Sequence, residues 1–287
     1  MSANLALRES ITYLLGDALA TVVTEALMMI GLFLAPFVVF AIIIHLFEGL
    51  TQRRLAERFG WSSVMWTGWL GTPIHELSHA AMCWLFRHRV DEIALFEPDR
   101  QSGRLGYVRH SFRRGNWFEE VGNLFIGIAP LVGGSLVLSL LLWLFYPTAA
   151  ATGISSSRTI HQSGGLLSQV WVVATHIGGE VLAWRNLNTS RFWIFMYLVL
   201  CVGSHMAPSR SDYQGAARGA LLAGGFVLVA TFLMAAVGFD LNRMLNIFVQ
   251  AMGPLLAILG LTVFLVGLST AAVYLLTAVV PRAYRVD

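Results

Sequence analysis

The chain has 287 residues, of which 56% are hydrophobic and only 12% are charged, and its mean hydropathy is +0.68. These values exclude an ordinary soluble globular protein and predict a polytopic membrane protein. The formal net charge is +3, but the arginines cluster in short stretches beside apolar segments. That arrangement is typical of topology determinants and anionic-lipid contacts, so we expect no nucleic-acid partner.

Apolar windows of about 20 residues predict six membrane-spanning helices joined by loops. They cover residues 26–47, 62–86, 120–146, 191–207, 217–239 and 250–280. We therefore expect an all-α polytopic fold in a single membrane domain, residues 1–287. Within it we expect a first span with its loop (1–60), a core of spans two to four (61–216) and two accessory spans (217–287).

The second predicted span carries the sequence His75-Glu76-Leu77-Ser78-His79. Two histidines four residues apart lie on one face of a helix, where both imidazoles can bind a zinc ion. The intervening Glu76 can act as general base toward water at the metal. A buried His–Glu hydrogen-bond cluster is the alternative, but a metal site is favoured because these polar groups are costly in mid-membrane.

Cys83 and Cys201 also lie inside apolar segments, which indicates no disulfide or redox role.

The loop of residues 87–119 allows a small β-hairpin. Two stretches with strand-like residues, 89–97 and 104–112, flank the turn-like sequence Pro98-Asp99-Arg100-Gln101-Ser102-Gly103. An exposed strand there could hold an unwound peptide by strand addition. A basic loop that contacts lipid headgroups is the alternative interpretation.

Catalytic zinc usually takes three protein ligands, so a third ligand must come from another helix. The fourth predicted span is short and leads into the sequence SHMAPSRSD, from Ser204 to Asp212. Asp212 is the favoured third ligand, because two crossings after the second span return the chain to the same side of the membrane. His205 is the competing residue, either as ligand, as oxyanion contact or as an ordinary hydrogen-bonding histidine.

Residues 166–185 are apolar but interrupted by Gln169, His176 and Glu180, and we interpret them as an amphipathic helix at the membrane interface. If this segment crossed the membrane, Asp212 would lie on the opposite face, so the metal site and the six-span count depend on each other. His176 and Glu180 are spaced i, i+4, and a local contact or a solvated face is favoured over a metal pair.

The distribution of arginine predicts the orientation. Twelve arginines lie on the side of the N-terminus, the loop 87–119, the segment 208–218 and the C-terminus, against seven on the other side. By the positive-inside rule, both termini and the active site should face the cytoplasm, with the chain in the cell (plasma or inner) membrane.

On these residues the chain resembles the site-2 proteases, which are intramembrane zinc metalloproteases, in their compact six-span type. The likeness covers about residues 61–215 and rests mainly on HExxH in the second span with an Asp at the fourth. Residues 128–131, Ile-Ala-Pro-Leu, are similar to the family's Gly-Pro-containing motif, with Ala129 where Gly is usual. Near Asp212 the chain departs from the family, with Ser204 at the distance of the usual Asn and Tyr213 where Gly is usual.

The resemblance implies a Zn²⁺-dependent peptidase that cuts within or near the transmembrane segment of a membrane-protein substrate. It implies His75, His79 and Asp212 as metal ligands and Glu76 as catalytic base. Candidate substrate or oxyanion contacts are His205, Ser204, Pro130 and Asn123. It also implies a membrane-associated sheet after the second span. Beyond the resemblance, we expect contact with the lipid bilayer and, because the sequence shows no PDZ or ligand-sensing module, gating by a separate regulatory membrane partner.

Two other functions stay open at the level of sequence. One is a non-catalytic membrane scaffold that retains the metal, which the altered Asp motif favours and the intact Glu76 disfavours. The other is a transporter, because intramembrane His and Glu suit ion paths, although no repeated halves are visible. The substrate, its pathway and the oligomeric state do not follow from the sequence.

Overall fold

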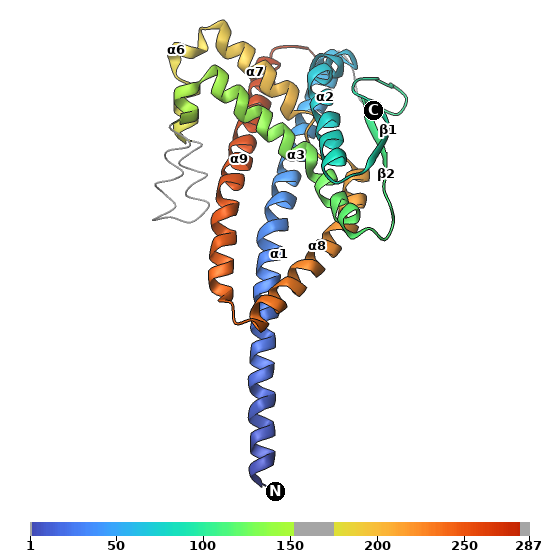
Figure 1. Ribbon diagram of the computed structural model, residues 1–287. Coiled ribbons are helices and arrows are strands. Elements are labelled where there is room, and N and C mark those ends of the chain that lie inside the picture. Colours follow the sequence, from blue (N-terminus) through green and yellow to red (C-terminus); the bar gives the residue numbers. More distant parts are fainter. Residues whose placement is uncertain (1, 152–174, 282–287) are drawn as a thin grey trace.

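The computed structural model describes residues 2–151 and 175–281, with side chains from residue 16 onward. The part of the chain that the structure describes is mostly helical and has one two-stranded sheet (Figure 1). In chain order the elements are α1 (Ser2–Phe59), α2 (Ser62–Leu85), β1 (Arg89–Ala94), β2 (Tyr107–Ser111), α3 (Trp117–Phe145), α6 (Trp184–Leu187), α7 (Ser190–Gly203), α8 (Arg210–Ala236) and α9 (Leu241–Leu276).

The prediction of a helical membrane protein is confirmed at this level. Among the described residues, four helices are long and apolar enough to cross a bilayer, and they lie at Gly16–Phe59, Trp117–Phe145, Arg210–Ala236 and Leu241–Leu276. The second and fourth predicted spans correspond to α2 and α7, which do not belong to these four. α2 carries many polar residues, and the 14 residues of α7 extend over only about 21 Å, less than the hydrocarbon thickness of about 30 Å.

The count of six successive crossings is not confirmed, because α1 and α9 run parallel. Thr51 Oγ1 lies 2.9 Å from Thr270 Oγ1, and one turn later Arg54 Nε donates to Thr277 Oγ1 at 2.9 Å. In a chain of six crossings the first and last spans would be antiparallel. The start of α1 and the end of α9 instead lie at opposite ends of the bundle (Figure 1).

The difference arises at the junction of α7 and α8. The main-chain nitrogen of Ala207, in this junction, donates to Glu48 near the end of α1 at 3.1 Å. α8 then follows α1 back toward its N-terminal part, so that Gly224 packs against Ile30. Polar side chains of α1 therefore hold the interruption between α7 and α8 inside the bundle. The hydropathy pattern had predicted the end of a complete crossing at this point.

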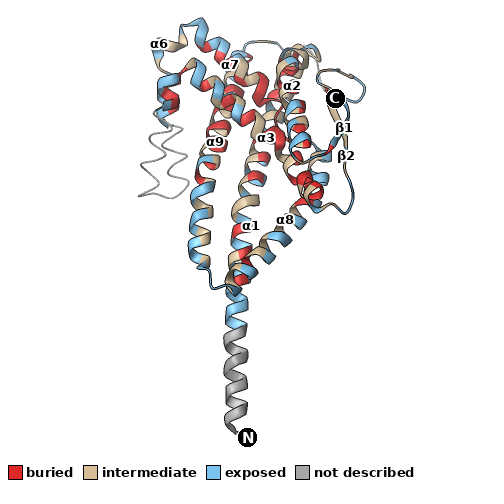
Figure 2. Cartoon of the chain, in the orientation of Figure 1, coloured by how far each residue is buried: buried red, intermediate tan, exposed pale blue. Residues whose placement is uncertain are grey.

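The packed core lies where α1, α3, α7 and α9 meet. Its fully buried side chains include Ile44, Leu131, Leu138, Phe195, Leu259 and Leu265. Figure 2 shows buried residues concentrated in this half of the molecule, while α8 and the neighbouring part of α9 are largely exposed. Large apolar residues on α8, such as Leu221 and Phe226, are 79% and 63% exposed, which suits a helix surrounded by lipid.

The hairpin predicted within residues 87–119 is present. β1 pairs antiparallel with β2, from Arg89 opposite Ser111 to Ala94 opposite Tyr107, with an irregularity between Val90 and Glu92. The strands are shorter than the predicted stretches. At the turn, Ser102 Oγ and the main-chain nitrogen of Gln101 donate to Asp99, and these bonds hold the pKa of the Asp99 carboxyl below its usual value.

Residues 166–174 of the interfacial helix predicted at 166–185 lie outside the described residues, which resume at residue 175. Residues 175–181 are helical and lead into α6. Glu180 accepts hydrogen bonds from Thr148 Oγ1 at 3.2 Å and from Arg185 Nη2 at 3.1 Å. The contact with Arg185 is a local contact of the kind that the sequence favoured over a metal pair at Glu180.

Candidate metal centre

The two histidines of HExxH lie on one face of α2, as their spacing predicts. Their ring centroids are 4.8 Å apart, and the two Nε2 atoms are 3.1 Å apart. His79 is buried, with only 7% of its surface exposed, and His75 is half-buried. Two imidazole nitrogens this close together could supply two of the ligands of a metal ion.

Main-chain carbonyls set the orientation of both rings. His75 Nδ1 donates to His205 O at 2.7 Å, and His79 Nδ1 donates to Ile126 O at 2.8 Å. A hydrogen on Nδ1 leaves Nε2 of a neutral imidazole with a free lone pair, which is the form that binds a metal. The carbonyls come from the α7–α8 junction and from α3, so tertiary packing fixes the ligand geometry.

Asp212 completes the group from the first turn of α8. Its Oδ1 lies 3.4 Å from His79 Nε2 and its Oδ2 lies 3.9 Å from His75 Nε2. Ser209 is the N-cap of α8 and forms a capping box with Asp212, in which the Ser209 main-chain nitrogen donates to Asp212 Oδ2 at 2.6 Å. The cap explains why a carboxylate stands at this point of the helix and how its direction is fixed.

The donor set fits zinc. Zn–N and Zn–O distances of about 2.0–2.2 Å in a tetrahedron separate the ligand atoms by roughly 3.3–3.6 Å. The observed separations of 3.1, 3.4 and 3.9 Å scatter around that value. Among the described residues, His75, His79 and Asp212 thus bring their donor atoms around one point, as the sequence predicted. Three protein ligands leave a fourth position for water or substrate.

Glu76 lies beside this group under the hairpin. It is 7% exposed, and Gly106, just before β2, packs directly on it. A Cβ atom on Gly106 would lie 3.0 Å from Glu76 Cγ and 2.7 Å from Ala94 O, so only glycine allows the hairpin to approach this closely. The hairpin therefore covers the residue predicted to act as the base.

Glycines of α3 allow this helix to pack closely against both α8 and α2. A Cβ atom on Gly127 would lie 2.6 Å from Asp212 O and 2.7 Å from Ala216 Cβ, and one on Gly133 would collide with Ser78. Small residues let helix backbones approach closely in membrane bundles. The close approach at Gly127 brings the first turn of α8, which carries Asp212, against α3.

α1 contributes two polar residues that the sequence reasoning missed. Gln52 Nε2 donates to Ser204 O at 3.1 Å and lies 3.3 Å from His205 Nε2, while Glu48 accepts from Ala207. Both residues hold the α7–α8 junction in place behind His75. Polar residues next to an apolar span are a recognisable signal, because they are costly in a membrane unless they serve a purpose.

His205 and Ser204, predicted as substrate or oxyanion contacts, lie in the second layer around the histidines. The His205 ring contacts Gln52 and Ser204 Oγ, and its main-chain carbonyl binds His75. Among the described residues, its ring does not belong to the converging donor group. A direct role in the reaction stays a prediction.

Asn123 and Pro130, the other two predicted contacts, are both buried on α3. Asn123 Nδ2 donates to Glu120 O at 3.2 Å, within its own helix. Pro130 follows Ile126 and Gly127, which contact His79 and Asp212. The structure thus places the α3 segment beside the centre through its backbone, and substrate contact by these two side chains stays a prediction.

Comparisons with protein-family models, with curated proteins and with solved structures give no match to this chain. The likeness to site-2 proteases therefore rests on the motif residues alone.

Proposed function

We propose that this chain is an intramembrane zinc metallopeptidase that hydrolyses a peptide bond in or near the transmembrane segment of another membrane protein. One observation carries the proposal. Two imidazole nitrogens and a carboxylate converge from α2 and α8, each fixed by a main-chain hydrogen bond, and a buried glutamate lies next to them. Pre-oriented donors with an adjacent base are the arrangement that metal-assisted hydrolysis requires.

The residues of the chain have separate tasks in this mechanism. A bound zinc ion supplies an acidified water and polarises the substrate carbonyl. Glu76 accepts a proton from the attacking water and passes it to the leaving amine as the peptide bond breaks. His75, His79 and Asp212 hold the ion, while the carbonyls of His205 and Ile126 keep the two imidazoles in the binding tautomer.

The bundle leaves room for an apolar substrate beside the helix that carries Asp212. A cavity of about 700 Å³ lies between α1, α3, α8 and α9. Its lining includes Met29, Phe33, Phe125, Phe226 and Phe248. A helical substrate satisfies its own backbone groups, so we expect cleavage where Gly, Pro, Asn or Ser weakens the helix.

A non-catalytic metal-binding scaffold is the second candidate, and one observation favours it. The hairpin packs on Glu76 at Gly106, which limits the space around the base. An enzyme of this kind would need the hairpin to move when substrate enters. Metal content and cleavage separate the two functions.

The test uses full-length protein, with zinc content measured after purification and membrane proteomes compared between cells that carry each variant. Glu76→Gln should retain zinc and lose cleavage, so that a precursor accumulates, whereas His79→Ala should lose the zinc of this centre and cleavage. Asp17→Asn, an exposed carboxylate at a distance from the site, is the matched control and should behave as the unmodified chain. Unchanged substrate processing in the Glu76→Gln variant would contradict the peptidase proposal and leave the metal-binding scaffold as the remaining candidate.

A further inference from the structure

A second group of metal-ligating side chains lies one helical turn beyond His79, at the end of α2. The helix ends in a Schellman motif, in which the His88 main-chain nitrogen donates to Cys83 O at 2.8 Å and that of Arg87 to Trp84 O at 3.2 Å. Arg87 has φ +61°, in the left-handed region that a non-glycine residue rarely adopts. The turn reverses the chain and brings His88 back beside Cys83.

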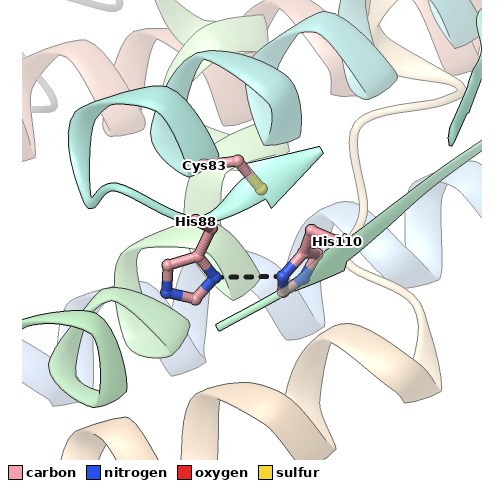
Figure 3. Close-up of side chains that lie close together, drawn as sticks. All are labelled: Cys83, His88 and His110. Atoms are coloured by element: carbon pink, nitrogen blue, oxygen red, sulfur yellow. Dashed lines mark hydrogen bonds between the residues drawn. The ribbon is translucent and has the colours of Figure 1, made fainter. Parts of the chain in front are cut away.

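The hairpin adds a third residue. His110 on β2 is paired with Val90 on β1, and its Nδ1 lies 3.0 Å from His88 Nδ1. Cys83 Sγ and one nitrogen of each ring all lie within 4.8 Å of one another. Figure 3 shows the sulfur and the two imidazoles facing one another from α2, the turn and β2.

The main chain also sets the tautomer of His88. His88 Nε2 donates to Glu119 O at 2.7 Å, which leaves the lone pair of Nδ1 directed at His110 and Cys83. Cys83 is fully buried, and His88 is 5% exposed. An outer carbonyl that fixes a ligating imidazole is the usual companion of a protein metal site.

We propose that Cys83 Sγ, His88 Nδ1 and His110 Nδ1 form a second metal site that binds Zn²⁺. One thiolate with two imidazoles suits a borderline-soft ion, and it differs from the two imidazoles and one carboxylate of the first centre. The Nδ1–Nδ1 separation of 3.0 Å is close to the roughly 3.3 Å expected for two nitrogens on tetrahedral zinc. Water completes the coordination, and the thiol proton is released on binding.

This site would join the end of α2 to the base of the hairpin. The other end of the same hairpin covers Glu76 at Gly106, so an ion at Cys83 would fix the position of the cover over the first centre. The inference does not depend on peptidase activity, because it concerns different ligands. The alternative without metal is a hydrogen bond from His110 Nδ1 to His88 Nδ1, in which Cys83 has no part.

Cobalt substitution tests the site on the full-length chain in detergent. The chelator-treated protein is titrated with Co²⁺, since a thiolate ligand gives a charge-transfer absorption in the near ultraviolet that imidazole and carboxylate ligands do not. We expect this band and about two equivalents of bound metal in the unmodified chain. The band should persist in His79→Ala, which removes only a ligand of the first centre.

Cys83→Ala should lose the band and one equivalent of metal, whereas Cys201→Ala, which removes the other buried thiol, should keep both. If Cys83→Ala does not fold, as judged by gel filtration, His110→Gln on the partly exposed strand takes its place and should weaken Co²⁺ binding at this site at least tenfold. The proposal of a second site would be overturned if the folded, unmodified chain bound Co²⁺ without showing the thiolate band. Persistence of the band in Cys83→Ala would overturn it as well.

Discussion

The two proposed metal sites meet α2 one helical turn apart, at His79 and Cys83, yet they are assembled in different ways. The first joins α2 to α8, and its third ligand lies far along the chain on a capped helix end. The second joins the end of α2 to the hairpin that follows it, through a tight turn and one strand. The first therefore depends on the packing of membrane helices, and the second on local chain geometry. Variants should affect them independently.

The largest expected effect is that of Asp212→Ala. Loss of a direct ligand should weaken zinc binding at the first centre by more than the about 10–100-fold seen when an outer-shell partner is lost. Cleavage should fall with it, while the cobalt–thiolate band of the second group stays unchanged. Metal titration with spectroscopic detection measures both. Equal loss at both groups would show that they are not independent.

Gly127→Ala should act through helix packing. The added Cβ meets Asp212 O and Ala216 Cβ, so α8 must move away from α3, at about 1–3 kcal/mol of unfolding free energy. Zinc affinity of the first centre should fall, and that of the second should not. Gly225→Ala on α8 is the control, because a Cβ there meets nothing within 4 Å. Thermal unfolding and zinc titration of the two variants test the difference, and equal behaviour would contradict the role of Gly127.

Ser209→Ala removes the cap that orients Asp212, so it should destabilise α8 by about 1 kcal/mol and weaken zinc at the first centre about tenfold or less. Thr189→Ala removes the equivalent cap of α7 and should have a similar effect on stability without the effect on zinc. The comparison is made by thermal unfolding and zinc titration. A matched loss of zinc affinity in Thr189→Ala would indicate a general effect of helix capping.

The smallest effect concerns the outer turn of the hairpin. Hydrogen bonds from Ser102 and Gln101 lower the pKa of Asp99, so the folded turn is stabilised above the unfolded pKa of about 3.8, and this stabilisation is lost as the pH falls through the folded value. Asp99→Asn should show faster amide exchange at residues 99–104 at neutral pH, and the difference should vanish in acid. Metal binding at both groups should not change. A change in either would mean that the turn is coupled to the sites.

The sequence alone anticipated the helical membrane class, the hairpin and the pairing of His75 with His79, because each has a short-range signal. Hydropathy marks apolar helices, and the spacing of His75 and His79 places both on one face. Asp212 was reached by counting crossings, and the count of six was not confirmed. The three side chains meet because the α7–α8 junction lies inside the bundle, held by Glu48 and Gln52. A hydropathy pattern does not show where a helix is interrupted inside the bundle.

The residue types and their periodicity determined by themselves that this chain enters a membrane and can present two imidazoles on one helical face. Tertiary structure alone decided which carboxylate meets them, which carbonyls fix their tautomers, and that Cys83 gathers with His88 and His110. The physical reason is how far apart in the sequence the interacting residues lie. Helix periodicity acts over four residues, whereas close approach through Gly127, the reversal at Arg87 and the parallel packing of α1 and α9 depend on contacts between distant segments.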